Sequence, residues 1–247
     1  MACPGYAPLV PSIAELLARR VRSDGGAPLL TYYDTDDGVR TELSGTTFAN
    51  WVAKTCNLLT DELLVSPGDA VELLVAARHP GHWMTLVWAQ ACWQTGLVVT
   101  LGRPAEARLV VCGPAYADVD PGDAELVACS LHPFGLGLAP PVPPGVVDYA
   151  AEVRVQPDAW SGVPVGPDAP AWHDHERMLT QVDLLLGGPA ARQRLLVRPG
   201  APWPTVRDAL VAPLRDGGST VVLSGTADEQ RITQVGTSER VDAVVRD

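Results

Sequence analysis

Residues 70–101 contain a strand, a helix and a strand in succession, and this order constrains the fold more than any other feature of the chain. Residues 70–76 form a short apolar run of the kind found in buried parallel strands. Pro80 then begins a helix that Gly96 ends, and residues 97–101 are again apolar. A strand–helix–strand crossover joins parallel strands. The sequence therefore predicts an α/β fold with a mostly parallel sheet and flanking helices.

The segment before this unit predicts a helix, a hairpin and a second helix. Ser12 and Glu15 have the spacing of a capping box at the start of an amphipathic helix. Residues 30–33 and 40–43 alternate as strands do and enclose an Asp-Gly turn, so they predict an N-terminal hairpin. Ser44 is positioned to cap the helix that follows.

The segment after this unit predicts further strands around an irregular region. Residues 109–112 and 125–130 read as short strands, and residues 131–171 are rich in proline and glycine. Residues 146–155 suit either a strand or irregular structure. From residue 172 the sequence predicts helices at 178–187, 205–215 and 226–235, the last with a capping box at Thr226, and strands at 194–197, 220–223 and 240–245. We expect residues 1–247 to form one unit.

Composition and charge limit which binding partners and which cellular compartment are expected. The chain is 47% hydrophobic, enough for a real core, and its net charge is −11 with no basic run, which argues against nucleic acid or an anionic membrane as a partner. The uncharged run 79–102 contains Gln90, Gln94 and Gly96, so we interpret it as a buried helix, a glycine turn and a strand, not a membrane span.

No export signal is visible, and no C-x-x-C pair occurs, so we expect a cytoplasmic protein with reduced, buried thiols. The cysteines are Cys3, Cys56, Cys92, Cys112 and Cys129.

Several segments, taken in order, carry a resemblance to a known superfamily. They are LTYY at 30–33, PGD at 67–69, the apolar run 83–101, HERML at 175–179 and APL at 212–214. Together they resemble the N-terminal part of the adenylate-forming enzymes, the AMP-dependent synthetases and ligases, which include acyl-CoA synthetases. More narrowly, ACSLHPFG at 128–135 and PGVVDYA at 144–150 are similar to a short actinobacterial family of uncharacterised, truncated members. The resemblance implies the first subdomain of an acyl-CoA synthetase-like N-terminal domain.

The departures from this superfamily imply a loss of its chemistry. The superfamily has a glycine-rich phosphate loop with a lysine directly before the helix that the resemblance begins at Glu176. The corresponding residues 167–172 contain two prolines and a carboxylate, and the chain's one lysine, Lys54, lies on the second helix. The span 198–203 lacks the histidine of the superfamily's acyl pocket. The chain also ends before the adenine segment and the lid lysine.

These departures favour a non-catalytic homologue, with no catalytic residues and no cofactor, that acts as a binding, scaffold or regulatory protein. A protein partner or a second copy is expected on the face left by the missing subdomain. The alternative is a subunit or remnant of a carboxylate-activating ligase completed by another chain, or a new activity in the old crevice.

Two further motifs have simpler explanations than catalysis. The runs SGTT at 44–47 and SGT at 224–226 spell parts of a phosphate loop but lack a lysine and are better interpreted as helix caps. The pair His79 and His82 lacks a third ligand, and the pair His173 and His175 encloses Asp174, which is better interpreted as a helix cap, so we predict no metal site.

The position of any ligand site follows from the fold class. In open α/β sheets ligands bind outside the carboxyl ends of the strands. We therefore place a remaining site near the loop at residues 130–144 and the turn before His173, with His132, Phe134, Trp172 and His173 as candidates. The alternative is that the prolines only fix a surface loop.

Overall fold

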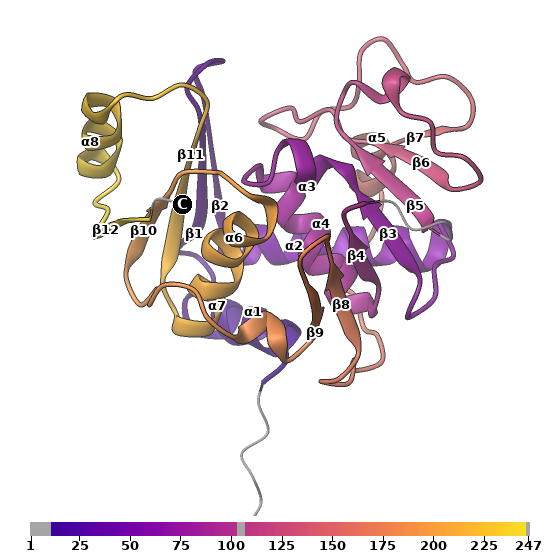
Figure 1. Cartoon of the computed structure of the whole chain (residues 1–247), viewed down its shortest axis with the longest axis horizontal. Coiled ribbons are helices and arrows are strands. Elements are labelled where there is room, and N and C mark those ends of the chain that lie inside the picture. The colour runs from indigo at the N-terminus through magenta and orange to yellow at the C-terminus, as the bar shows by residue number, and fades with distance from the viewer. Residues whose placement is uncertain (1–10, 103–106, 246–247) are drawn as a thin grey trace, which may run out of the picture.

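The chain forms two sheets with helices packed between them (Figure 1). The computed structural model describes residues 11–102 and 107–245. The predicted α/β fold with mostly parallel strands is confirmed, and the strands are divided between a five-stranded and a seven-stranded sheet, here called sheet A and sheet B. Cys3 lies outside the described residues; the other four cysteines are buried and free.

Sheet A joins the two ends of the described chain. Its order is β12-β10-β11-β1-β2. The strands are β1 (Pro28–Asp34), β2 (Val39–Ser44), β10 (Arg194–Val197), β11 (Ser219–Ser224) and β12 (Ala243–Val245). The β1–β2 pair is the predicted antiparallel hairpin, while β1 pairs with β11, and β10 with both β11 and β12, in parallel.

Sheet B is built from the middle of the chain, in the order β7-β6-β5-β3-β4-β8-β9. The strands are β3 (Ala70–Leu73), β4 (Val98–Thr100), β5 (Ala107–Cys112), β6 (Glu125–Ala128), β7 (Val146–Asp148), β8 (Pro170–His173) and β9 (Met178–Thr180). All neighbours are parallel except β8 and β9, which form an antiparallel hairpin at one edge.

The helices begin and end largely where the local sequence indicates. They are α1 (Ile13–Asp24), α2 (Gly45–Asn57), α3 (Leu74–Arg78), α4 (Trp83–Thr95), α5 (Tyr149–Arg154), α6 (Pro202–Val206), α7 (Ala212–Asp216) and α8 (Glu229–Ser238). A π-helical turn extends α2 (Leu58–Glu62), and another joins α6 to α7 (Arg207–Val211). Ser12 and Ser44 cap α1 and α2 as predicted, and Gly96 ends α4 in the left-handed conformation.

The helix α4 lies at the centre of the molecule, between the two sheets (Figure 1). Its large side chains, Trp83, Trp88 and Trp93, are all at most 1% exposed. The run 79–102 is thus a buried helix, a glycine turn and the strand β4, as predicted. Among the described residues, no helix has the length and apolarity needed to cross a bilayer.

The predicted helix at 178–187 is wrong. Residues 170–180 form the β8–β9 hairpin, followed by a short 3-10 turn (Asp183–Leu185). The apolar residues that suggested the helix do not share a face, because Met178 is 77% exposed whereas Leu185 is buried. Pairing of β8 with β4, through Val99 and Trp172, places the segment in the sheet.

Smaller differences also have local causes. The strand predicted at 70–76 ends at Leu73, and the chain turns into α3. His82, not Pro80, caps α4, and Asp228, not Thr226, caps α8, in each case by accepting a hydrogen bond from a backbone N–H of the first turn. The segment 146–155 is a strand followed by the helix α5.

Candidate functional site

The turn at the carboxyl end of β8 replaces the loop that the resemblance led us to expect. The assignment of residues 167–172 to the phosphate loop is wrong, because it required a helix at Glu176, and Pro170–His173 is a strand. The turn is instead residues 174–177. Its backbone is closed on itself: the N–H of Asp174 donates to the Arg177 carbonyl at 3.0 Å.

The Asp174 carboxylate holds this turn together. It accepts hydrogen bonds from Trp172 Nε1 at 2.9 Å, from the N–H of Glu176 at 2.8 Å and from Arg177 Nη1 at 3.1 Å. Partial burial opposes ionisation of Asp174, but these three donors outweigh it and lower its pKa. The turn therefore presents no free cation, and two of its N–H groups are already used.

A second polar group lies beside this turn on sheet B. Glu72 on β3 is 2% exposed, and its carboxylate accepts hydrogen bonds from Thr100 Oγ1 at 3.2 Å and from the N–H of Gly102 at 3.1 Å. Gly102 has φ of 120°, and a Cβ there would lie 2.8 Å from Cε1 of His175. The exposed imidazole of His175 thus covers the end of β4, above a buried carboxylate.

The loop after β6 bridges the two sheets. Thr41 on β2 donates to the Pro133 carbonyl at 3.1 Å, and His82 Nε2 lies 3.2 Å from the Leu131 carbonyl. Gly135, with φ of 62°, packs so closely on Trp51 that a Cβ would approach that ring to 2.6 Å. Such contacts fix the path of the loop across the gap between the sheets.

His82 is a tether of this loop that the sequence analysis did not recognise. Its Nδ1 accepts from the N–H of Met84, so Nε2 carries the proton and donates to Leu131. Burial lowers the pKa of His82, the nearby His79 lowers it further, and the bond to Leu131 opposes the shift, so that the pKa is about 3. No local signal indicated this role, because the predicted helix began at Pro80 and histidine is not among the side chains that favour the capping position.

The four candidate residues do not come together. Trp172 is 1% exposed and packs on Trp203, with ring centroids 5.2 Å apart, so it belongs to the core. His132 and Phe134, which is 76% exposed, lie on the loop after β6, their ring centroids 5.9 Å apart. His173 is the last residue of β8, and three strands lie between β8 and β6. Four spacings of about 4.8 Å therefore separate β8 from β6, which is about 19 Å. A ligand role for any of them stays a prediction.

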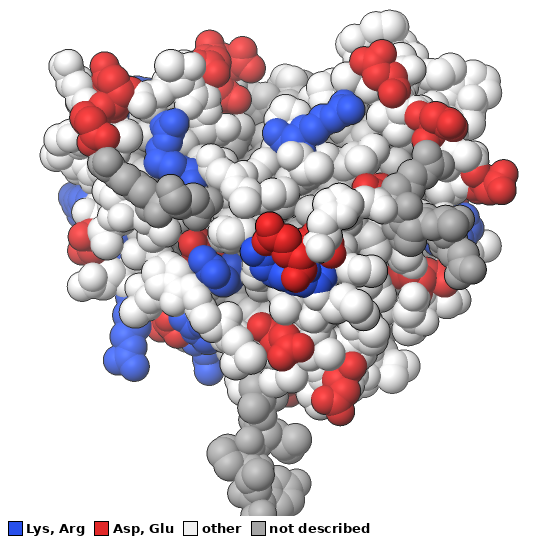
Figure 2. Space-filling view, in the orientation of Figure 1, with Lys and Arg blue, Asp and Glu red and all other residues white. Residues whose placement is uncertain are grey.

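The chemistry available at the carboxyl edge of β8 is acidic and hydrogen-bonding. It comprises the exposed imidazoles of His173 and His175 and the carboxylates of Asp174 and Glu176. This set suits an uncharged or cationic group better than a phosphate. Among residues 11–102 and 107–245, no three His, Cys, Asp or Glu side chains gather as a metal site would require. In Figure 2 the acidic and basic side chains described on this face are scattered and form no continuous basic track.

Comparisons with known proteins agree with this fold. No model of a known protein family matches the chain. A TIGR03089 family protein of Mycobacterium tuberculosis is 39% identical over 155 residues, which cover 58% of this chain and 59% of that protein. The structure of an acyl-CoA synthetase of Brucella canis matches with a TM-score of 0.76 at 16% identity, over 97% of this chain and 48% of that one.

A benzoate CoA ligase of Burkholderia xenovorans matches with a TM-score of 0.70 at 13% identity, over 95% of this chain and 50% of that one. The chain thus has the fold of the N-terminal part of acyl-CoA synthetase-like ligases and spans about half the length of these two enzymes.

Proposed function

We propose that this chain is a non-catalytic homologue of the AMP-dependent synthetases and ligases, and that it acts by binding another molecule as a scaffold or regulatory protein. The proposal is supported most directly by the residues of the β8–β9 region itself. Residues 167–186 contain no glycine and no lysine, and residues 170–180 within this span form the closed β8–β9 hairpin.

A phosphate loop works through free backbone N–H groups and a nearby cation. In the hairpin turn, two of these N–H groups and the arginine are already engaged. The N–H groups of Asp174 and Glu176 are bonded within the turn, and Arg177 is paired with both of these carboxylates at 3.1 and 2.7 Å. Transfer of an adenylate depends on positioning and neutralising the triphosphate. A turn with two carboxylates repels it.

The partner we propose is a protein or a second copy of this chain. Apolar side chains are exposed to solvent on and after β9: Met178 at the start of the strand is 77% exposed, and Leu186, after the 3-10 turn, is 63% exposed. Nucleic acid and membrane are not proposed, because the net charge is −11. Four buried, free thiols support a reducing compartment, the cytoplasm.

The test is pyrophosphate exchange. The protein is incubated with ATP, Mg²⁺ and a panel of carboxylic acids, and an active acyl-CoA synthetase is assayed in parallel as the positive control. We expect no exchange above the protein-free background with any acid. Metal-dependent exchange with one of them would show that the chain is an enzyme, and the proposal would be abandoned.

A further inference from the structure

A polar hollow lies at the edge of sheet A where β10 and β11 begin, opposite their carboxyl ends. It is an open depression of about 480 Å³, within the range of about 300–1,000 Å³ that small-molecule sites occupy. Four arginines line it, together with the carboxylates of Asp24, Glu42 and Glu239. The arginines are Arg20 on α1, Arg192 just before β10, Arg194 at the start of β10, and Arg240 after α8. We call it the amino-end hollow.

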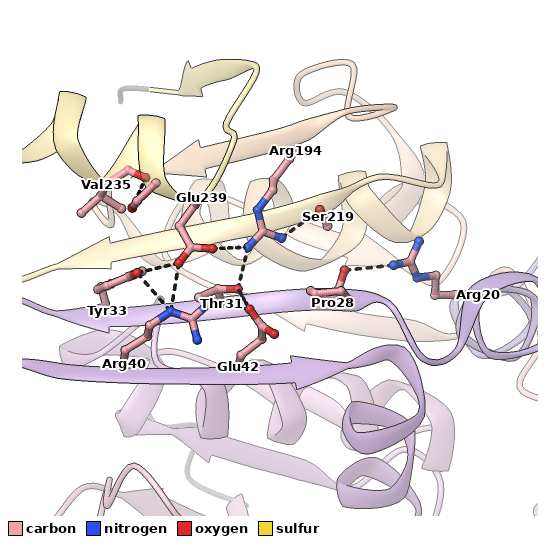
Figure 3. A network of polar contacts seen from close by, with 11 residues as sticks. Arg20, Pro28, Thr31, Tyr33, Arg40, Glu42, Arg194, Ser219, Val235 and Glu239 are labelled. Atoms are coloured by element: carbon pink, nitrogen blue, oxygen red, sulfur yellow. Dashed lines mark hydrogen bonds and ion pairs between the residues drawn. The ribbon is translucent and has the colours of Figure 1, made fainter.

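The network beside the hollow is already neutral (Figure 3). Glu239 accepts hydrogen bonds from Tyr33, from Arg40 at 2.9 Å and from Arg194 at 2.8 Å. Arg40 also pairs with Glu42 at 2.6 Å. Two arginines and two glutamates thus balance within this network, and Arg194 is fixed by further bonds to Thr31 and Ser219.

The other three arginines have no such balance. Among the described residues, no carboxylate lies within ion-pair distance of Arg20, Arg192 or Arg240, although Arg192 acts on Asp216 at longer range. Asp24 is the one further carboxylate in the lining. The hollow therefore carries an excess positive charge on a chain whose net charge is −11.

Two donors at the hollow also lack acceptors. Nε of Arg20 and Nε of Arg194 are buried and have no hydrogen-bond partner in the structure. A buried donor left unpaired costs about 1–3 kcal/mol. Both atoms are closed to solvent, so a ligand in the hollow reaches them only if the two guanidinium groups turn toward it.

The backbone conformation at Arg240 indicates that the arginine side chain has a role of its own. Arg240 follows α8 with φ of 53°, the left-handed conformation that glycine or asparagine usually occupies after a helix. A long side chain is disfavoured there. An arginine in this place is explained if its guanidinium serves the hollow that it lines.

We propose that the amino-end hollow binds the phosphate group of a small organic phosphate. Guanidinium groups bind phosphate oxygens in bidentate geometry, and here Arg20, Arg192, Arg194 and Arg240 line one space. Asp24 accepts a hydrogen bond from a hydroxyl of the ligand. This site goes beyond the proposed function and does not depend on it, because it lies away from the β8–β9 turn and involves no adenylation.

The test is calorimetric titration of the full chain with inorganic phosphate, glycerol 3-phosphate and succinate. We expect saturable binding of phosphate and tighter binding of the phosphomonoester. Both should weaken about tenfold or more in Arg192→Gln and in Arg240→Gly, since each removes a charge-assisted contact. Arg231→Gln, which removes the same charge from the exposed side of α8, is the matched control and should bind as the native chain does.

Thermal unfolding gives a second, independent readout. Without ligand, Arg240→Gly should melt at a higher temperature than the native chain, because glycine relieves the left-handed strain. A rise in melting temperature together with a loss of affinity supports the site. The proposal is overturned if no phosphate probe binds saturably, if Arg231→Gln weakens binding as much as Arg240→Gly, or if succinate binds more tightly than the phosphates.

Discussion

The helix α4 and the outer face of sheet A hold distant parts of the chain together by opposite means. Around α4 the contacts are apolar: Trp83, Trp88 and Trp93 are buried between the sheets. On sheet A, Tyr33, Arg40, Arg194 and Glu239 join residues far apart in sequence through ion pairs and hydrogen bonds (Figure 3). Apolar burial stabilises the fold without requiring a particular contact geometry. In a partly buried ionic network, by contrast, the main effect is the free-energy cost of removing one partner and leaving the other unpaired.

The largest effect should come from the apolar centre. Trp93→Ala should lower the free energy of unfolding by about 3–5 kcal/mol, because it removes a fully buried indole and its bond to the Ala171 carbonyl at 3.1 Å. Urea denaturation measures it. Val155→Ala, at a side chain that is 78% exposed, is the control and should change little. Equal effects at both positions would contradict the central role of α4.

Acid should weaken the link between the sheets through His82. Its pKa of about 3 lies below the ordinary 6.5, so between these values the unfolded chain binds more protons than the folded one. The contribution is complete above pH 6.5 and is lost as the pH falls toward 3, by about 1.4 kcal/mol per pH unit at most.

His82→Asn keeps a capping oxygen but removes this titration. Unfolding measured from pH 7 to pH 4 should therefore show a shallower decline in the variant than in the native chain. Parallel pH profiles would mean that His82 does not control acid stability.

Breaking the ionic network should have an intermediate effect. Glu239→Gln leaves Arg194 and Arg40 without their shared carboxylate, and we expect a loss of about 1–3 kcal/mol. Partial burial opposes ionisation of Glu239, but its hydrogen bonds lower the pKa to about 2, so its contribution is present above pH 4.5 and fades toward 2. The exposed Glu62→Gln is the control. If the free energy of unfolding of Glu239→Gln equals that of the native chain, the network does not contribute to stability.

The smallest effect compares two buried threonines of sheet A. Thr31 Oγ1 accepts from Arg194 and donates to Glu42, whereas Thr220 Oγ1 has no partner. Thr31→Val should lower stability by about 1 kcal/mol, and Thr220→Val should be neutral or stabilising. Denaturation of the two variants side by side measures the difference. The reverse order would show that the hydroxyl bonds of Thr31 contribute nothing.

Local sequence alone determined the elements whose signals lie within a few residues. The hairpin β1–β2, the caps at Ser12 and Ser44 and the end of α4 at Gly96 were predicted because turn and cap chemistry is set by neighbours in the chain. The parallel character of the sheets also followed, since a strand–helix–strand crossover has few alternatives.

Only the tertiary structure decided the β8–β9 hairpin and the fate of the candidate site residues. Residues 178–187 have helical spacing, but pairing of β8 with β4 and the burial of Trp172 outweigh that local preference. The same packing places Trp172 in the core and His132 on a loop several strands from His173. Strand order and the amino-end hollow depend on which distant segments meet, and no pattern within one segment records this.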